Sequence, residues 1–237
     1  MTWRRGSRDG FDEAHQQFLV MLDEARQALE AALAARLGRA DAAASFDLVA
    51  DLEQRADAAE IRLRQRLLVH ATVHGATDIP ACLRYMSIGK DAERISDLAL
   101  GLCHITARST VPDEPVLDDL TRLGESVVAV LRRMPDVISD EDGEAARALI
   151  KEARAVQQGC AARLDDVLRA EAGEEVLQAG LADIGAGAST WDPQRLGQPV
   201  ALALTYRHLG RVAANALNIL SSVVVPLDHL DYPTGVE

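Results

Sequence analysis

Aromatic residues are scarce in this chain of 237 residues: phenylalanine, tryptophan and tyrosine together make up 3%. Residues that favour strands are few, whereas alanine, leucine, arginine and glutamate recur along the whole sequence. The latter four are strong helix formers. The composition therefore argues against a fold built on sheets and predicts an all-α protein.

Basic residues are outnumbered, with 25 lysines and arginines against 37 aspartates and glutamates, so that the formal net charge is −12. A general nucleic-acid binder gains its affinity by neutralising phosphates with basic side chains. No nucleic-acid partner is therefore expected. The acidic balance instead favours a solvated acidic surface, or cation binding wherever carboxylates converge.

Cysteines and long apolar runs are also few. The three cysteines, Cys82, Cys103 and Cys160, form no Cys-x-x-Cys pair, and an odd number without such a pair is typical of buried thiols in a reduced compartment. No window of about 18 uninterrupted apolar residues occurs, and the N-terminus lacks the apolar core of a signal peptide. A cytoplasmic protein without a membrane span is expected.

Sequence motifs of common catalytic sites are absent. The chain has no Gly-x-Ser-x-Gly elbow, no P-loop and no Gly-x-Gly-x-x-Gly turn. A ferritin-like oxidase needs Glu-x-x-His motifs from two helices of a bundle, and none is present. A non-enzymatic protein is expected, and a hydrolase or oxidase that uses a carboxylate-bound cation is the enzymatic alternative.

The spacing of apolar residues predicts six helices. They are expected over residues 11–37, 41–73, 79–107, 116–133, 139–171 and 199–225. A linker with two prolines covers residues 108–115, and residues 185–193 are expected to break the helical pattern. The fourth helix is expected to end near Pro135, and Ser139 with Asp142 resembles a box that starts the fifth.

A weak internal repeat divides the six helices into three and three. A shift of 117 positions lays Lys90 on Arg207 and Arg94 on Arg211. Two related units joined at the linker are therefore expected, as two tandem three-helix bundles over residues 1–109 and 110–237.

Two acidic stretches interrupt the apolar pattern of the first half. The stretch DLEQRADAAE contains Glu53 and Asp57, and KDAERISDLA contains Glu93 and Asp97. Residues four apart lie one above the other on a helix, so each pair shares one helix face. If the two helices form an antiparallel hairpin that turns near Gly75, Asp57 faces Glu93 and Glu53 faces Asp97.

The same register makes further predictions along the hairpin. It places Glu60 opposite Lys90 as an ion pair, and it brings Phe46 against His104. Two levels of the hairpin would then consist only of carboxylates. Like charges at such close range repel, so these carboxylates need protons, basic neighbours or a cation between them.

All-oxygen ligands suit hard cations, so a divalent or trivalent metal ion, namely iron, manganese, magnesium or calcium, is the expected occupant. In the alternative, the four carboxylates point to solvent and pair with Arg55, Arg62 or Arg94, and the chain is a metal-free helical adaptor.

The stretch KDAERISDLA resembles the D-x-E-R-I-G-D-x-A signature of the PhoU family of bacterial and archaeal phosphate-uptake regulators, with Ser96 where the family has glycine. The resemblance implies a pair of three-helix bundles that bind metal clusters through acidic motifs. The matching metal-binding positions here are Glu53, Asp57, Glu93 and Asp97.

The resemblance also implies how such a protein acts. It would be cytoplasmic, or peripheral to the inner face of the membrane, and would restrain a phosphate transporter, a sensor kinase or both. The sequence leaves open the type of transporter, the identity of the metal and whether the chain forms a homodimer.

The second half departs from the family pattern. Gly210 and Ala214 stand at the repeat positions of Glu93 and Asp97 and cannot ligate a metal, and in the facing stretch EARAVQQG only Glu152 is acidic. The second bundle is therefore expected to have lost its metal site and to act as a structural or docking half.

Near the expected turn, two histidines, an aspartate and a cysteine lie close in sequence: His70, His74, Asp78 and Cys82. This spacing can hold zinc on a helix face. The expected role is instead that of polar residues in an exposed turn. His208 and His229 have no acidic or cysteine residue at metal-binding spacing.

Overall fold

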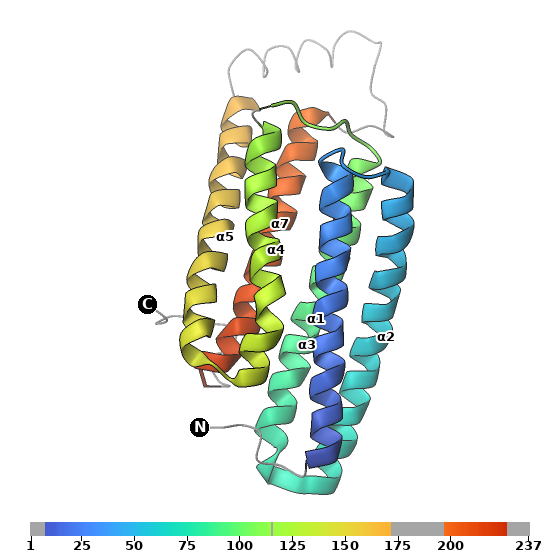
Figure 1. Ribbon diagram of the computed structural model, residues 1–237, viewed down its shortest axis with the longest axis vertical. Coiled ribbons are helices and arrows are strands. Elements are labelled where there is room, and N and C mark those ends of the chain that lie inside the picture. The colour runs from blue at the N-terminus through green and yellow to red at the C-terminus, as the bar shows by residue number, and fades with distance from the viewer. Residues whose placement is uncertain (1–7, 115, 172–196, 227–237) are drawn as a thin grey trace, which may run out of the picture.

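The computed structural model of the protein describes residues 8–114, 116–171 and 197–226. Within these ranges the chain forms six α-helices and one 3₁₀ turn, η1 (Gly75–Thr77). The helices are α1 (Arg8–Arg36), α2 (Ala42–His74), α3 (Ile79–Thr106), α4 (Val116–Asp140), α5 (Gly143–Glu171) and α7 (Gln198–Val224). Figure 1 shows α1, α2 and α3 as one group of three beside α4, α5 and α7. The all-α, six-helix prediction is confirmed.

Local sequence explains where the first helices begin and end. Two residues after the end of α1, the backbone of Gly38 adopts a φ of 69°, a left-handed value that glycine reaches without strain. Asp41 caps α2, because its Oδ1 accepts a hydrogen bond of 2.8 Å from the backbone N–H of Ala44. Gly75, with a φ of 74°, follows α2 and opens η1. The hairpin therefore turns at the predicted position.

The boundary between α4 and α5 differs from the prediction. Pro135 lies inside α4, which continues to Asp140 instead of ending before the proline. The neighbouring side chains of Met134 and Ile138 are buried, and their packing outweighs the hydrogen bond that the proline removes. The fifth helix starts at Gly143, where Asp142 accepts hydrogen bonds from two backbone N–H groups. The expected start at Ser139 is wrong.

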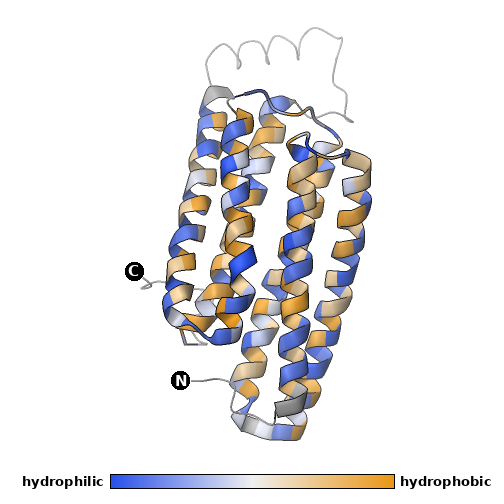
Figure 2. Ribbon diagram, in the orientation of Figure 1, coloured by the Kyte–Doolittle hydropathy of each residue, from blue (hydrophilic) through white to orange (hydrophobic). Residues whose placement is uncertain are grey.

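The apolar side chains form one core that draws on all six helices. Buried residues from both groups of three belong to a single hydrophobic cluster. Figure 2 shows the corresponding alternation of apolar and polar residues around each helix. Glycines permit close helix contacts between the groups: a Cβ at Gly124 of α4 would lie 3.1 Å from the Leu33 side chain of α1. The division at residues 109 and 110 into two units stays a prediction.

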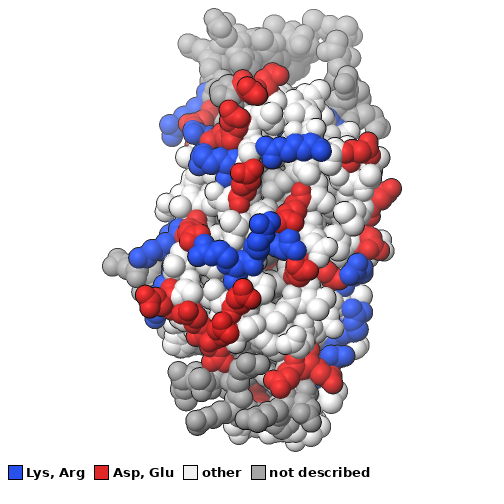
Figure 3. Space-filling view, in the orientation of Figure 1, with Lys and Arg blue, Asp and Glu red and all other residues white. Residues whose placement is uncertain are grey.

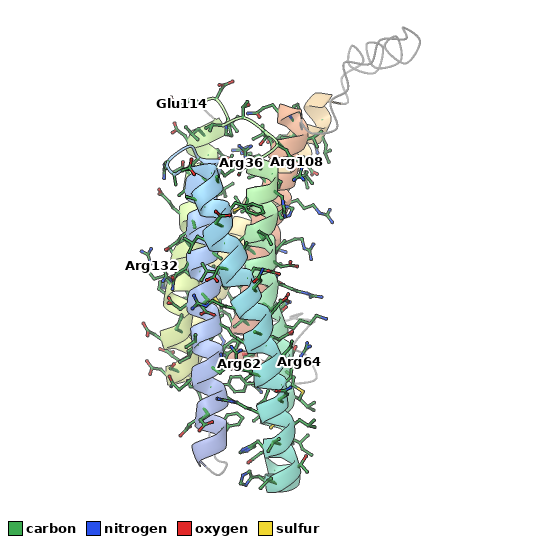
Figure 4. The ribbon with its side chains drawn as sticks, turned by 90° about the vertical axis from the view of Figure 1, so that its right-hand side faces the viewer. Arg36, Arg62, Arg64, Arg108, Glu114 and Arg132 are labelled. Carbon is green, nitrogen blue, oxygen red and sulfur yellow. The ribbon has the colours of Figure 1, made fainter. Side chains whose placement is uncertain are left out.

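Arg36 joins three segments where α1 ends. Its Nε donates to the Thr205 hydroxyl of α7 at 3.1 Å, and its Nη1 donates to the carbonyl oxygen of Thr110 in the linker at 2.9 Å. The side chain is almost fully buried, and its Nη2 has no hydrogen-bond partner in the described part of the chain. Figure 4 shows Arg36 near the linker.

Further polar contacts lie between α3 and α7. The Asn218 side chain donates to the buried Asp91 carboxylate at 3.4 Å, and Arg84 donates to the carbonyl oxygen of Ser222. The seam between α1 and α4 is charged: Arg132 of α4 lies 2.8 Å from Glu30 of α1. Figure 3 shows acidic and basic side chains interleaved over this face. The two halves therefore meet through polar as well as apolar contacts.

Candidate functional site

The four predicted carboxylates share the outer face of the α2–α3 hairpin. Glu53 and Glu93 are half-buried, whereas Asp57 and Asp97 are exposed. Burial raises the pKa of Glu53, and the charges of Asp57 and Asp97 raise it further. Glu53 thus senses a carboxylate on its own helix and one on the neighbouring helix, as the predicted register requires.

Glu93 is the most perturbed member of this group. Burial raises its pKa from 4.5 to about 7, with further contributions from Asp97, Glu60 and Asp57, and the Arg94 guanidinium opposes the shift only in part. Close to neutral pH this carboxyl therefore exchanges readily between its protonated and charged forms. A positive charge placed near Glu93 would favour its charged, deprotonated form.

Other contacts test the hairpin register. The rings of Phe46 and His104 meet edge to face with centroids 5.1 Å apart, so this predicted contact is confirmed. The predicted ion pair between Glu60 and Lys90 is wrong, because Glu60 pairs with Arg64 of its own helix at 2.7 Å. Glu60 also adds a fifth carboxylate to the site, three residues after Asp57, and that spacing was the signal for it.

Arginines do not neutralise the four predicted carboxylates. Arg55, which the metal-free alternative pairs with them, instead contacts Glu24 and lies 3.5 Å from Asp51. In the described ranges none of the four takes part in an ion pair. Within the described residues these four carboxylates are therefore held in no ion pair, and the Arg94 guanidinium offsets only part of the charge around Glu93.

The side chains nevertheless stop short of a ligand cage. Among the residues that the structure describes, no group of three or more histidine, cysteine, aspartate or glutamate side chains is arranged to hold a metal ion. The donor set itself fits hard cations, since it consists of carboxylate oxygens without competing ion pairs.

The corresponding face of the second half is used for packing. A Cβ at Gly210 of α7 would lie 3.2 Å from the Cβ of Cys160, so this glycine lets α7 approach α5 closely. Glu152 of α5 pairs with Arg133 of α4 at 2.7 Å. These positions therefore serve contacts between helices, and Ala214 offers no ligand atom.

Sequence reasoning missed a cluster of one aspartate and two arginines in the second half. Asp119 of α4 accepts from Arg122 at 2.6 Å, from Arg163 at 2.9 Å and from the Tyr206 hydroxyl at 3.3 Å. Burial alone would raise the pKa of Asp119, but the two arginines outweigh it and lower the pKa. The cluster joins α4, α5 and α7, and its arginines neutralise the charge of Asp119. No short sequence motif predicts it, because its residues come from three separate helices.

His208 of α7 lies against Gly101 of α3. A Cβ at position 101 would be 2.6 Å from the His208 Nε2, and the Nδ1 lies 2.7 Å from the carbonyl oxygen of Leu204. Burial lowers the pKa of His208, whereas the nearby Asp97 charge acts in the opposite direction. His208 therefore does have an acidic neighbour, which spacing along a single helix could not reveal.

The histidines near the turn also differ from expectation. His70 is buried, and its Nε2 lies 2.9 Å from the Oδ2 of the equally buried Asp78. The ring of the exposed His74 lies beside that of His70, with centroids 4.4 Å apart. The prediction of an exposed polar turn is thus wrong for His70 and Asp78, which tie the end of α2 to the start of α3.

Comparison with known proteins supports the fold independently. No protein-family model matches the sequence, and no similar sequence was found among curated proteins. Among solved structures, PhoU from Pseudomonas aeruginosa aligns with a TM-score of 0.72 and 15% identity over 93% of this chain and 96% of that one. The phosphate transport system regulatory protein PhoU from Streptococcus pneumoniae aligns with a TM-score of 0.70 and 16% identity, covering 93% and 94%. The chain therefore has a PhoU-like fold.

Proposed function

We propose that the protein is a non-enzymatic regulator of phosphate uptake or phosphate signalling, which acts on a phosphate transporter or a sensor kinase at the cytoplasmic face of the membrane. The observation that carries the proposal is the PhoU-like fold over 93% of the chain. One of the two similar proteins is a regulatory protein of a phosphate transport system. The matching acidic motif in the first half adds to this support.

The cellular test is phosphate uptake in the organism that encodes the chain. Deletion of the gene should raise the uptake of radioactive phosphate from phosphate-rich medium, because a restraint on transport is lost, and the wild-type chain should restore the lower rate. Uptake that is unchanged by deletion, together with unchanged activity of phosphate-responsive genes, would contradict a regulatory role.

We propose in addition that a divalent or trivalent cation binds at the outer face of the α2–α3 hairpin. Glu53, Asp57, Glu93 and Asp97 would hold it. Support comes from the absence of ion pairs to these carboxylates within the described ranges and from the raised pKa values of Glu53 and Glu93. A bound cation would supply fixed positive charge and hold α2 and α3 together, and the partner would recognise the resulting surface.

Metal content is the direct test of this cation site. The protein, purified without chelators, should contain metal by elemental analysis, and the double variant E93A/D97A should lose it. A matched control is D47A/D51A, which removes two aspartates with the same spacing from α2. Equal metal content in the wild type and E93A/D97A would rule out the site.

A metal-free adaptor is the second candidate function. It is favoured by one observation, namely that the described side chains form no group arranged to hold a metal ion. In that case the wild type would contain no metal, while deletion of the gene would still change phosphate uptake. The two measurements together therefore separate the candidates.

A further inference from the structure

The lower part of the α2–α3 hairpin, residues 61–90, is here called the hairpin end. In Figure 1 its tip projects beyond the lower ends of α4, α5 and α7. The described part of the chain has eleven large hydrophobic residues that are exposed, and six of them lie in the hairpin end. These six are Ile61, Leu68, Val69, Val73, Ile79 and Leu83. Such a concentration of exposed aliphatic side chains marks an interaction surface.

The charge of the hairpin end differs in sign from that of the whole chain. Residues 61–90 contain five cations and one acid, which gives a net charge of +4 in a chain of −12. The single acid, Asp78, is buried against His70. Two of the five cations are paired with acids just outside the hairpin end, Arg66 with Glu13 at 3.4 Å and Arg64 with Glu60 at 2.7 Å. The exposed Arg62 and Lys90 form no ion pair within the described residues, and they carry the uncompensated positive charge of this surface.

The apolar and basic residues occupy successive levels of the hairpin end. Between residues 67 and 83 no charged side chain is exposed, and Val73 has 69% of its surface exposed there. This apolar level extends from Leu68 to His74, a rise of about 9 Å along α2. Arg66 and Arg62 follow at about 12 and 18 Å from the end of the helix. Figure 4 shows Arg62 and Arg64 on opposite flanks of α2.

We propose that the hairpin end docks on an anionic lipid bilayer. Amphipathic segments of peripheral proteins bury their apolar residues about 5–10 Å deep at the boundary between headgroups and acyl chains, which matches the apolar level. The arginines behind that level then reach the lipid phosphates, to which their charge is complementary. Val69 and Val73 line a hollow beside Glu13 of α1, whereas Ile79 and Leu83 lie on α3. The six apolar side chains therefore do not share one groove, which favours a fluid surface over one docked helix.

Within the described residues no helix combines the length and apolarity that crossing a bilayer needs. This inference uses neither the carboxylate site nor the proposed regulatory role, and its test can fail while those proposals hold.

Vesicle co-sedimentation of the full chain tests the proposal. The protein should bind vesicles of phosphatidylcholine and phosphatidylglycerol mixed seven to three, and should bind pure phosphatidylcholine vesicles at least tenfold more weakly. The double variant L68D/V73D should bind the anionic vesicles at least tenfold more weakly than the wild type. The reason is that two aliphatic side chains, which the bilayer would bury, are replaced by charged ones. The matched control V20D/L48D changes one exposed valine and one exposed leucine elsewhere and should bind normally.

The electrostatic part has its own variant. R62Q should weaken binding to anionic vesicles about fivefold, the usual effect of one arginine near such a surface. R147Q, which removes an exposed arginine from α5, should have no effect. Circular dichroism and thermal melts confirm that each variant is folded.

Three results would overturn the proposal: no binding to anionic vesicles, equal binding by L68D/V73D and wild type, or equal binding to charged and neutral vesicles. Sedimentation velocity of the lipid-free protein provides a further check. If L68D/V73D turns a dimer into a monomer, the hairpin end is a contact between two copies of the chain, and lipid docking is the wrong assignment.

Discussion

Replacement of Glu93 by glutamine tests whether burial and the neighbouring carboxylates disfavour the charged form of Glu93, as the structure indicates. In the metal-free protein, the folded state binds a proton at Glu93 more tightly than the unfolded state, because the pKa rises from 4.5 to about 7. The folded chain is therefore stabilised by this proton at low pH, and that stabilisation is lost as the pH rises through about 7. Wild-type stability should fall over this window relative to E93Q.

The size of the effect follows from the shift. A change of about 2.5 pKa units corresponds to about 3.4 kcal/mol. Because the Glu93 side chain is only half-buried, water screens much of this free energy, and we expect a difference in stability of about 1–2 kcal/mol. For a chain of this length that difference raises the melting temperature of E93Q at pH 8 by about 2–8 °C. At pH 5 the gap between E93Q and wild type should be less than half as large.

Thermal melts followed by circular dichroism, in buffers with a chelator at pH 5 and pH 8, measure this gap. The control is D47N, which alters a carboxylate of α2 outside the predicted site. A gap of equal size at both pH values, or no gap at all, would refute the argument that burial and the neighbouring carboxylates raise the pKa of Glu93. Addition of Mn²⁺ at pH 8 should then stabilise the wild type more than E93Q. If it does not, the cation site is wrong although the crowding is real.

Two further predictions concern the interior. Gly101→Val should destabilise the protein by about 1–3 kcal/mol in urea titrations, because the Cβ of the valine would lie 2.6 Å from the His208 Nε2. A second substitution, His208→Ala, should recover most of this loss of stability. If the effects of the two substitutions are simply additive, the contact is disproved. The native protein should show no thiol that reacts rapidly with Ellman's reagent at pH 8, whereas the denatured chain should show three. The reason is that Cys82, Cys103 and Cys160 are all buried, with burial raising the pKa of Cys103 to about 11 and that of Cys160 to about 12.

Local sequence signals sufficed for the first half of the fold. The apolar spacing and the turn glycine Gly75 predicted α2, α3 and the hairpin between them within one or two residues. Because helix spacing and one turn set the register, the carboxylates could be placed on one face. These features depend on short stretches of chain, which is why the sequence alone reveals them.

Features that depend on tertiary packing were not predictable. Pro135 should end a helix by local rules, but burial of its neighbours carries α4 onward. The predicted register placed Glu60 opposite Lys90, yet Glu60 pairs with Arg64, one turn away on its own helix. The register alone does not determine which of these partners a side chain takes. The contact of His208 with Gly101 needs the relative placement of α3 and α7, for which the sequence contains no spacing rule.

The buried guanidinium of Arg36 has a mechanical consequence. This side chain of α1 donates hydrogen bonds both to Thr205 of α7 and to Thr110 in the linker that leads into α4. A sliding movement between the two groups of helices would break these bonds and leave a buried positive charge without partners. The molecule should consequently move as a stiff unit. A force applied to the far end of α2 and α3 would then move α5 and α7 with it, because the two groups of helices would not bend relative to each other.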